Sequence, residues 1–291
     1  MTRRPLPSTL PTLAVAAALA VAACSKPAPE PTPAPPTPPQ PKVSVVAAPT
    51  TPHWDYGPGH GPALWASLSP DFAACAAGKS QSPIDIVKAQ TTTVAPAKTS
   101  YGLAELRVVH HEHVADGINN GHTIQVNYAG ADTLTLGDET FDLLQYHFHS
   151  PSENTVDGKH YAMEMHLVHK SKAGKLAVIG VFIEEGAENP AFAPIWANLP
   201  KEKGKEFHLE HLKVNVDDLL PAERTSWRFD GSLTTPPCSE GVKWVVMTAP
   251  VQLSAGQVAA FRAVIDNNNR PTQPLHGRTI ATDRVKDMTA R

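Results

Sequence analysis

The sequence lacks the excess of basic residues that nucleic-acid-binding proteins usually carry, and it contains only three cysteines. Charged residues make up 18% of its 291 residues, and the formal net charge is −3. Apolar residues make up 41%, which is typical of a globular protein. These values argue against a nucleic-acid partner, and we expect none.

The N-terminus has an apolar run, "LAVAAALAVAAC" at residues 13–24, that is too short to span a bilayer as a helix. The run follows Arg3 and Arg4 and ends in small residues, which predicts a secretory signal peptide over residues 1–24. Residues 21–24 resemble a bacterial lipoprotein cleavage box, which implies that Cys24 carries a lipid. Ordinary cleavage with Cys24 incidental is the alternative. Ser25 after the cysteine favours the outer membrane, so we expect an exported, periplasmic, membrane-tethered protein.

Residues 25–52 form a candidate linker, in which nine of the fifteen residues 27–41 are proline. Such a run prefers the extended polyproline helix and cannot join a packed core. At roughly 3 Å per residue it could hold a domain up to about 80 Å from a membrane. A flexible low-complexity tail is the alternative.

Two cysteines, Cys75 and Cys238, remain once Cys24 is assigned to the lipid. An even pair in an exported protein predicts a disulfide, with two buried thiols as the alternative. Residues 53–291 contain no second proline-rich break and no repeat, so a single domain is expected there. Short alternating or β-branched runs bounded by glycine turns predict a mainly β fold with a few short surface helices. The predicted strands are 106–114, 122–130, 132–137, 163–170 and 175–186, and the predicted helices are 191–199 and 254–265.

The stretch "QYHFHSP" at residues 145–151 places His147 and His149 on one face of a predicted strand. Asp157–Gly158 downstream predicts a hairpin turn. With this turn as the tip, residue 149 faces residue 166, which is a third histidine. The odd–even alternation, which does not depend on the loop length, is the firmer part of this prediction.

Three imidazoles that meet at one point form the ligand set of an open, catalytic zinc site, because a fourth position stays free for water. Zinc-bound water ionises near neutral pH and gives a hydroxide nucleophile. Gln145 and Glu164 each lie two residues before a ligand and are expected to orient the rings. A histidine cluster without metal is the alternative. His111 and His113 also share a face, but no third ligand is evident, so an exposed strand is expected there.

Six motifs together resemble the α-class carbonic anhydrases, in that family's order and over residues 53–284. They are "QYHFHSPSE", "MEMHLVH", "QSPIDI", "NNGHT", "GSLTTPPC" and "NNRPTQPL". The resemblance implies a zinc enzyme that interconverts CO2 and bicarbonate, with ester hydrolysis as a side activity. It also implies a single domain around a large, mostly antiparallel, twisted central sheet. The oligomeric state stays open, with a dimer as one alternative.

The family's functional residues match positions of this sequence. The resemblance implies His147, His149 and His166 as zinc ligands, Gln145 and Glu164 as their hydrogen-bond partners, Thr234 and Glu153 as the hydroxyl–carboxylate pair, and His122 as the proton shuttle. It implies Val168, Val178, Leu233, Thr235, Val242 and Trp244 as the CO2 pocket, Tyr56, Asn120 and Gln125 as the residues that hold waters, and Cys75–Cys238 as a disulfide.

Two other classes of protein remain as alternatives. One is a non-catalytic, surface-tethered binding or adhesion module on the same fold. Such relatives typically lose a zinc histidine, whereas all three are present here. The other is a zinc-storage protein, which would not need an apolar pocket.

Overall fold

The structure is a computed structural model that describes residues 52–87, 90–101, 103–111, 122–128, 130–202 and 206–283, with backbone pairing only at 90–93, 103–111 and 206–213. All of these residues lie in one compact unit, Pro49–Arg291. The predicted signal peptide with Cys24, the linker up to residue 51, Asn120, and the side chains of His111 and His113 lie outside the described residues. In the described part of the chain, no helix has both the length and the apolar character needed to cross a membrane.

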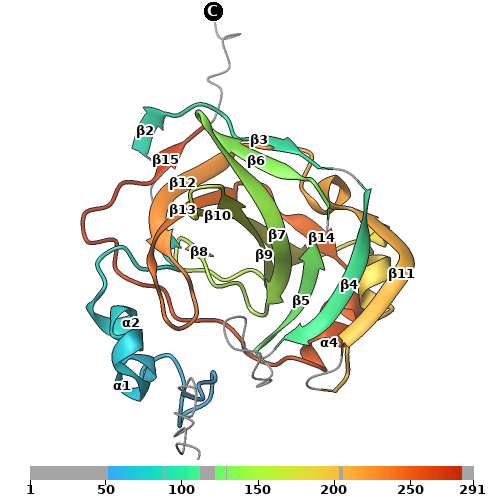
Figure 1. Ribbon diagram of the computed structural model, residues 1–291, viewed down its shortest axis with the longest axis horizontal. Coiled ribbons are helices and arrows are strands. Elements are labelled where there is room, and N and C mark those ends of the chain that lie inside the picture. The colour runs from blue at the N-terminus through green and yellow to red at the C-terminus, as the bar shows by residue number, and fades with distance from the viewer. Residues whose placement is uncertain are drawn as a thin grey trace, which may run out of the picture. The chain divides into compact units, whose positions relative to one another are not determined.

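The fold is built on one large curled sheet of thirteen strands (Figure 1). The strands of the chain are β1 (Asp85–Ile86), β2 (Gln90–Thr93), β3 (Lys98–Ser100), β4 (Leu103–His111), β5 (Thr123–Tyr128), β6 (Thr133–Leu136), β7 (Glu139–His149), β8 (Thr155–Val156), β9 (Met163–Ser171), β10 (Leu176–Glu185), β11 (Glu206–Asn215), β12 (Ser226–Ser232), β13 (Glu240–Met247), β14 (Val251–Leu253) and β15 (Ala281–Thr282). The helices are α1 (Trp65–Leu68), α2 (Ala74–Ala77), α3 (Ala193–Trp196) and α4 (Ala255–Arg262), with 3₁₀ turns η1 (Pro70–Phe72), η2 (Pro190–Phe192) and η3 (Val216–Leu219).

The strand order of the sheet is β11-β4-β5-β7-β9-β10-β13-β12-β15-β2, and β3, β6 and β14 pair at its sides. Most neighbours are antiparallel, whereas β10–β13, β10–β14 and β15–β2 are parallel. Strands β1 and β8 form a separate parallel pair. The predicted fold class is therefore confirmed, and the five predicted strands and two predicted helical regions correspond to β4, β5, β6, β9, β10, α3 and α4.

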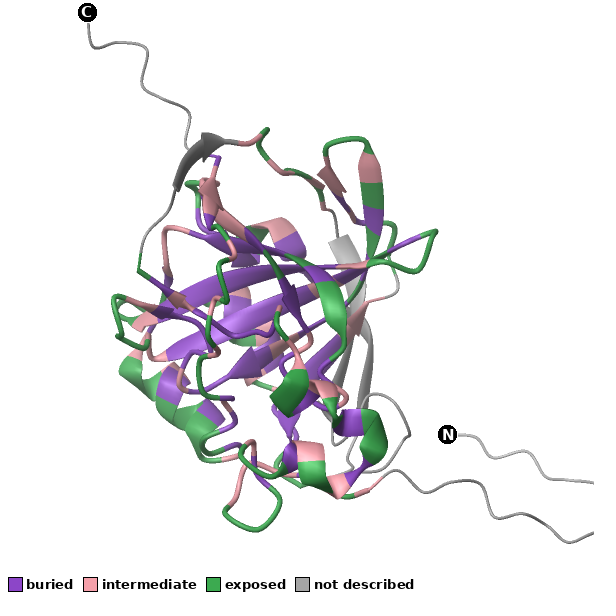
Figure 2. Cartoon of the chain, turned by 90° about the vertical axis from the view of Figure 1, so that its left-hand side faces the viewer, coloured by how far each residue is buried: buried purple, intermediate pink, exposed green. Residues whose placement is uncertain are grey.

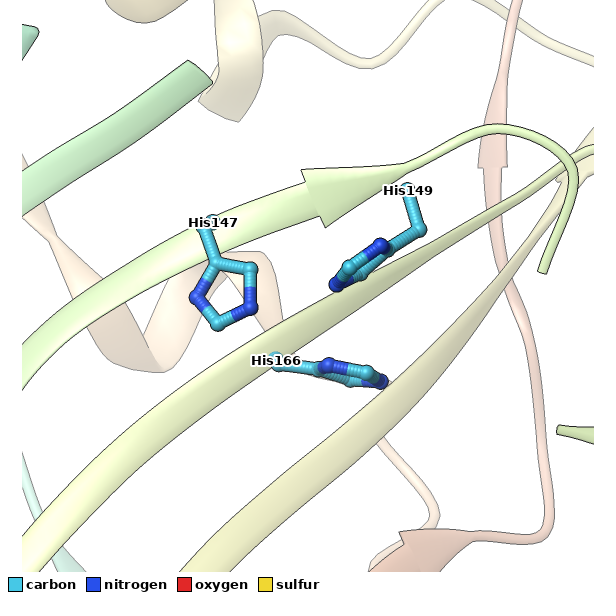
Figure 3. Close-up of side chains that lie close together, drawn as sticks. All are labelled: His147, His149 and His166. Carbon is cyan, nitrogen blue, oxygen red and sulfur yellow. The ribbon is translucent and has the colours of Figure 1, made fainter. Parts of the chain in front are cut away.

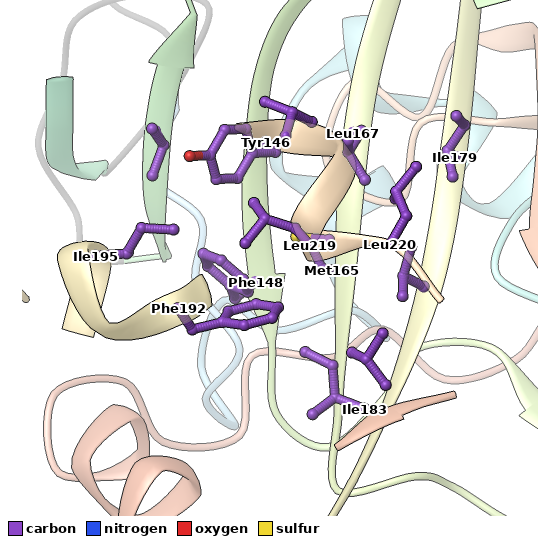
Figure 4. Close-up of a cluster of buried hydrophobic side chains, with 14 of the residues drawn as sticks. Tyr146, Phe148, Met165, Leu167, Ile179, Ile183, Phe192, Ile195, Leu219 and Leu220 are labelled. Atoms are coloured by element: carbon purple, nitrogen blue, oxygen red, sulfur yellow. The ribbon is translucent and has the colours of Figure 1, made fainter. Parts of the chain in front are cut away.

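Side-chain alternation on the central strands separates an apolar core from the face that carries the histidines. Tyr146 and Phe148 of β7, and Met165 and Leu167 of β9, are almost fully buried in the main hydrophobic cluster (Figure 4). Turn η2 and helix α3 cover this cluster with Phe192 and others. Figure 2 shows the buried residues concentrated along the central strands and the exposed ones on loops and helices. The residues between the core positions, which include the three histidines, therefore face the opposite side of the sheet.

A disulfide joins Cys75 of α2 to Cys238 in the loop before β13, as predicted. The two cysteines are separated by 163 residues along the chain. They pack with Trp54, Trp65 and Phe72 in a buried cluster separate from the main one. The cross-link therefore fastens the N-terminal helices to the loop that carries Thr234.

A buried histidine on the core face of β9 makes the stability of the fold depend on pH. Burial lowers the pKa of His169 to about 4, and Tyr101 Oη lies 2.9 Å from its Nε2. Because the pKa is about 6.5 in the unfolded chain, the unfolded state takes up this proton first as the pH falls. The contribution of neutral His169 to the free energy of unfolding is thus complete above pH 6.5 and is lost as the pH falls from about 6.5 to about 4.

We expect His169→Gln to remove up to about 3 kcal/mol of the stability difference between pH 7 and pH 4, from a pKa shift of about 2.5 units. Urea unfolding of both proteins across this range measures the effect. Comparison with the variant is needed because burial also lowers the pKa of His149 and His166, which titrate in the same direction. Identical pH slopes in the two proteins would contradict the prediction.

Candidate active site

The three histidines predicted as metal ligands lie together on one face of the sheet. His147 and His149 come from the end of β7, and His166 lies on the neighbouring strand β9. Their ring centroids are 5.0, 5.3 and 4.6 Å apart. One nitrogen of each ring lies within 4.8 Å of the other two. Figure 3 shows the three rings gathered around a common space.

The strand register differs from the predicted one by two residues. We expected His149 opposite His166, whereas His147 lies opposite His166 and His149 lies opposite Glu164. A shift of two residues leaves every side chain on the same face, since the side-chain period of a strand is two. The predicted convergence of the three rings therefore survives the error in register.

The connection between β7 and β9 explains the shift. The predicted turn at Asp157–Gly158 is present, with positive φ at both residues. Its two flanks have unequal lengths, because the chain before the turn bends inward. There the backbone amides of Glu153 and Asn154 donate hydrogen bonds of 2.8 Å to Glu164 Oε2.

Hydrogen bonds fix the orientation of the two rings on β7. Nδ1 of His147 lies 2.8 Å from Gln145 Oε1, and Nδ1 of His149 lies 2.7 Å from the main-chain oxygen of Asn268. Each Nδ1 donates to an oxygen, so each Nε2 is left as the acceptor nitrogen of a neutral ring. Of these two acceptor nitrogens, Nε2 of His149 is buried and has no hydrogen-bond partner.

The third ring is held from the opposite side. Nε2 of His166 lies 3.0 Å from Glu164 Oε1, at hydrogen-bond distance but without hydrogen-bond alignment. The side chain of Asn154 donates to the same carboxylate oxygen at 2.7 Å. Gly180 lies opposite His166 on β10, and a Cβ atom there would come within 2.9 Å of Glu164 Oε1. A glycine at this position leaves the space that the carboxylate occupies.

The chemistry of this donor set fits a zinc ion. Burial lowers the pKa of His149 to about 4 and holds the pKa of His166 well below its usual value. Both rings are therefore neutral at physiological pH, which is the form that binds metals. A buried imidazole nitrogen without a partner is costly, and a metal ion would satisfy it. Three nitrogen donors also leave a coordination position open, as in catalytic zinc sites.

A buried carboxylate lies beside the histidines. Glu153 Oε2 is 3.5 Å from His149 Nε2, and Glu153 Oε1 accepts a hydrogen bond of 2.8 Å from the backbone amide of Arg270. Burial raises the pKa of Glu153 to about 8, opposed by this amide and by a hydrogen bond with Thr234. A cation held by the neighbouring histidines would favour the ionised carboxylate.

The Arg270 side chain, which is 1% exposed, ties this region to the disulfide. Its guanidinium donates to Gln81 Oε1 at 2.9 Å and to the main-chain oxygens of Ser82 and Cys75 at 2.7 and 2.8 Å. It also lies over the Trp65 ring, 5.7 Å from the centroid. Three acceptors satisfy this buried charge, and in return Arg270 fixes the backbone amide that holds Glu153.

A cavity of about 300 Å³ opens beside the histidines and has mainly apolar walls. Val168, Val178 and Trp244 form a row across β9, β10 and β13, because Val178 pairs with both of the others. Of the residues that the resemblance implied, the lining includes Val168, Val178, Leu233, Thr234, Thr235, Trp244, Tyr56, Gln125 and His122. Val242 is buried in the hydrophobic cluster that also contains Val178 and Trp244, and its assignment to the CO2 pocket stays a prediction.

The residues at the other side of the cavity surround His122. The Trp54 ring stacks on the His122 ring at 3.4 Å, with an interplanar angle of 2°. Tyr56 packs edge-on against His122, and its buried hydroxyl has a pKa well above the usual value because of burial and of the Glu153 charge. Gln125 lies opposite His147 on the neighbouring strand.

Sequence reasoning missed four residues that support the site: Asn154, Asn268, Arg270 and Trp54. Asn268 and Arg270 lie within the motif "NNRPTQPL", and Asn154 directly follows the motif "QYHFHSPSE". The resemblance therefore covered these segments but implied no role for Asn154, Asn268 or Arg270. No signal in the sequence identified Trp54 as the partner of His122.

Comparisons with known proteins agree with this geometry. The family model described as "Eukaryotic-type carbonic anhydrase" matches residues 60–284. A carbonic anhydrase of Pectobacterium carotovorum is 44% identical over 78% of this chain and 90% of its own, and one of Nostoc sp. is 42% identical over 82% and 89%. The solved α-carbonic anhydrase of Thermovibrio ammonificans, in complex with sulfanilamide, superposes with a TM-score of 0.73 at 43% identity, over 79% of this chain and 99% of that one. The chain therefore belongs to the α-carbonic anhydrase family and is a carbonic anhydrase.

Proposed function

We propose that this enzyme interconverts CO2 and bicarbonate with a zinc ion bound by His147, His149 and His166. The observation that carries the proposal is the convergence of three imidazoles, two of which are buried and have a ring nitrogen without a hydrogen-bond partner. Zinc, when bound, supplies a Lewis acid that lowers the pKa of water to near neutrality, for which carbonic anhydrase is the standard example. The remaining groups of the site belong to the chain and orient the reactants.

Thr234 and Glu153 orient the nucleophile. A hydroxyl has one proton to donate, and Thr234 gives it to the buried carboxylate of Glu153. The lone pairs of the hydroxyl then accept the proton of the attacking oxygen and direct that oxygen's own lone pair toward the substrate. The hydrogen bond from the Arg270 amide keeps the carboxylate in place.

The row of Val168, Val178 and Trp244 would bind CO2. The molecule is small and apolar, so an apolar wall next to the metal removes it from water without a polar clamp. The Trp244 ring lies edge-on to His166, with centroids 4.9 Å apart. Small esters could reach the same nucleophile, and we propose ester hydrolysis as a side activity.

His122 would carry the proton from the active site toward solvent. It lines the same cavity as the three metal-binding histidines, and the imidazole group has an intrinsic pKa near neutrality. Tyr56 and Gln125, which also line the cavity, would hold the connecting waters.

We expect His122→Ala to slow turnover on the order of 10²-fold in dilute buffer, the lower end of the range for a general acid–base group. Added imidazole should restore the rate, because it accepts the same proton from solution, and kcat/KM should change little. The exposed His276, changed to Asn, serves as the control. An H122A enzyme insensitive to buffer and imidazole would show that the proton takes another route.

The central test is stopped-flow CO2 hydration with metal analysis on the purified protein, before and after treatment with a chelator. Activity that falls with the zinc content and returns on readdition supports the proposal. A folded protein that takes up no zinc, or that hydrates CO2 equally without it, refutes it. The binding-module alternative predicts no activity in either state, and the intact histidine set gives it no support.

We also propose that the enzyme is exported and held at the periplasmic side of the outer membrane by a lipid on Cys24. The basis is the sequence of residues 1–24 and the proline-rich segment that follows. Mass spectrometry of the membrane-extracted protein tests this: a diacylglyceryl adduct on Cys24 as the first residue is expected. A mature N-terminus at another position would refute it.

A further inference from the structure

A second group of potential metal ligands lies on the segment before α1. His53, Asp55 and His60 each place one ligand atom within 4.8 Å of the other two. Asp55 Oδ2 lies 3.5 Å from His53 Nε2 and 3.7 Å from His60 Nδ1, and the two rings are 5.1 Å apart. The mechanism proposed above uses none of these three side chains.

The distances suit shared coordination better than hydrogen bonding. Both exceed the length of a good hydrogen bond from an imidazole to a carboxylate. Zinc binds imidazole nitrogen and carboxylate oxygen at about 2.0–2.2 Å, so neighbouring ligand atoms around a tetrahedral ion lie about 3.4 Å apart. The two separations from Asp55 Oδ2 are close to this value.

The local backbone fixes Asp55 in the orientation that a ligand needs. Its Oδ1 accepts a hydrogen bond of 2.8 Å from the Gly57 amide, which leaves Oδ2 facing both imidazoles. The Asp55 amide donates to the His60 carbonyl at 3.1 Å and closes the loop between the two. The Asp55 carbonyl accepts from the indole of the fully buried Trp65 at 3.0 Å. The carboxylate is thus anchored to the core while its free oxygen lies between the two histidines.

We propose that His53, Asp55 and His60 form a second site for a divalent transition-metal ion such as Zn2+. Two imidazoles and one carboxylate are the donors that zinc, copper and nickel prefer over magnesium or calcium. The side chains are 52%, 35% and 49% exposed, so water completes the coordination and the ion exchanges with solvent. This differs from the buried three-histidine centre.

Occupancy of this site would act on the segment that covers His122. Trp54 lies between two of the ligands and stacks on the His122 ring at 3.4 Å. An ion that links His53 to His60 closes the loop 53–60 around Asp55. Hydrogen exchange of the amides in this loop is therefore expected to slow when the second ion binds.

Zinc titration of the zinc-loaded protein, followed by calorimetry and by metal content after dialysis, tests the site. The wild-type protein should bind one further equivalent. Asp55→Asn and His60→Asn should each lower the affinity for this second ion by about tenfold or more. Loss of a hydrogen-bond partner of a ligand already costs about 10- to 100-fold in metal affinity, and loss of the ligand itself should cost at least as much. His276→Asn, a matched change of an exposed histidine, should leave it unchanged.

The outcomes separate this site from the active site. His149→Ala should lose the buried ion and keep the second one. A wild-type protein that binds only one equivalent overturns the proposal. Two equivalents that persist with unchanged affinity in both D55N and H60N overturn it as well.

Discussion

Replacing His149 with alanine is expected to abolish zinc binding and CO2 hydration together. The change removes one of three donors and leaves a space where the buried Nε2 lay. Removing a hydrogen-bond partner of a metal-bound histidine costs about 10- to 100-fold in affinity, so removing the ligand itself should cost more than about 100-fold. Metal content after dialysis and the stopped-flow hydration rate measure the two losses.

Gln145→Ala provides a graded control for this experiment. It leaves all three histidines in place and removes only the 2.8 Å contact with His147 Nδ1. We expect affinity to fall by about 10- to 100-fold and activity to return when zinc is in excess. A His149→Ala enzyme that keeps zinc-dependent activity would mean that the three-histidine centre is not the catalytic site.

Removing the disulfide is expected to produce the largest loss of stability. The bond closes a loop of 163 residues, for which the chain-entropy relation gives about 5 kcal/mol, and native disulfides typically contribute 2–5 kcal/mol. We therefore expect Cys75→Ser with Cys238→Ser to lower the free energy of unfolding by about 2–5 kcal/mol. Urea unfolding of the oxidised wild type and of the double variant measures the difference.

Reduced wild-type protein is the control, because it lacks the cross-link but keeps both sulfur atoms. Its unfolding curve should move to that of the double variant. Without denaturant, where the variant stays folded, its activity should fall only a little. The reason is that Trp244 Nε1 donates a hydrogen bond of 3.0 Å to the Ser232 carbonyl oxygen and so also holds the segment before Thr234. If unfolding is the same with and without the bond, the cross-link does not stabilise the fold.

The strands were predictable because period-two alternation is a local property of the sequence. On β9, Met163, Met165 and Leu167 face the core, and His166 therefore faces the cavity. The register was not predictable by the same reasoning, because it depends on how the loop between β7 and β9 folds. The inward bend at Glu153 is fixed by the Glu164 carboxylate, which a count of residues from the turn does not include.

The metal ligands could be predicted from their shared strand face, but their supports could not. Asn268 lies 119 residues after His149 in the chain, and Arg270 lies 117 residues after Glu153. Contacts over such separations arise from the tertiary fold and leave no periodic pattern.

The pairing of β2 with β15 brings together the first and last strands of the large sheet. During biosynthesis, the early strand leaves the ribosome long before its partner exists. Asn268 and Arg270 also emerge late, so a nascent chain that ends before them has the three histidines without the groups that hold His149 and Glu153. Chains that end before residue 268 should therefore lack activity even though they contain all three histidines.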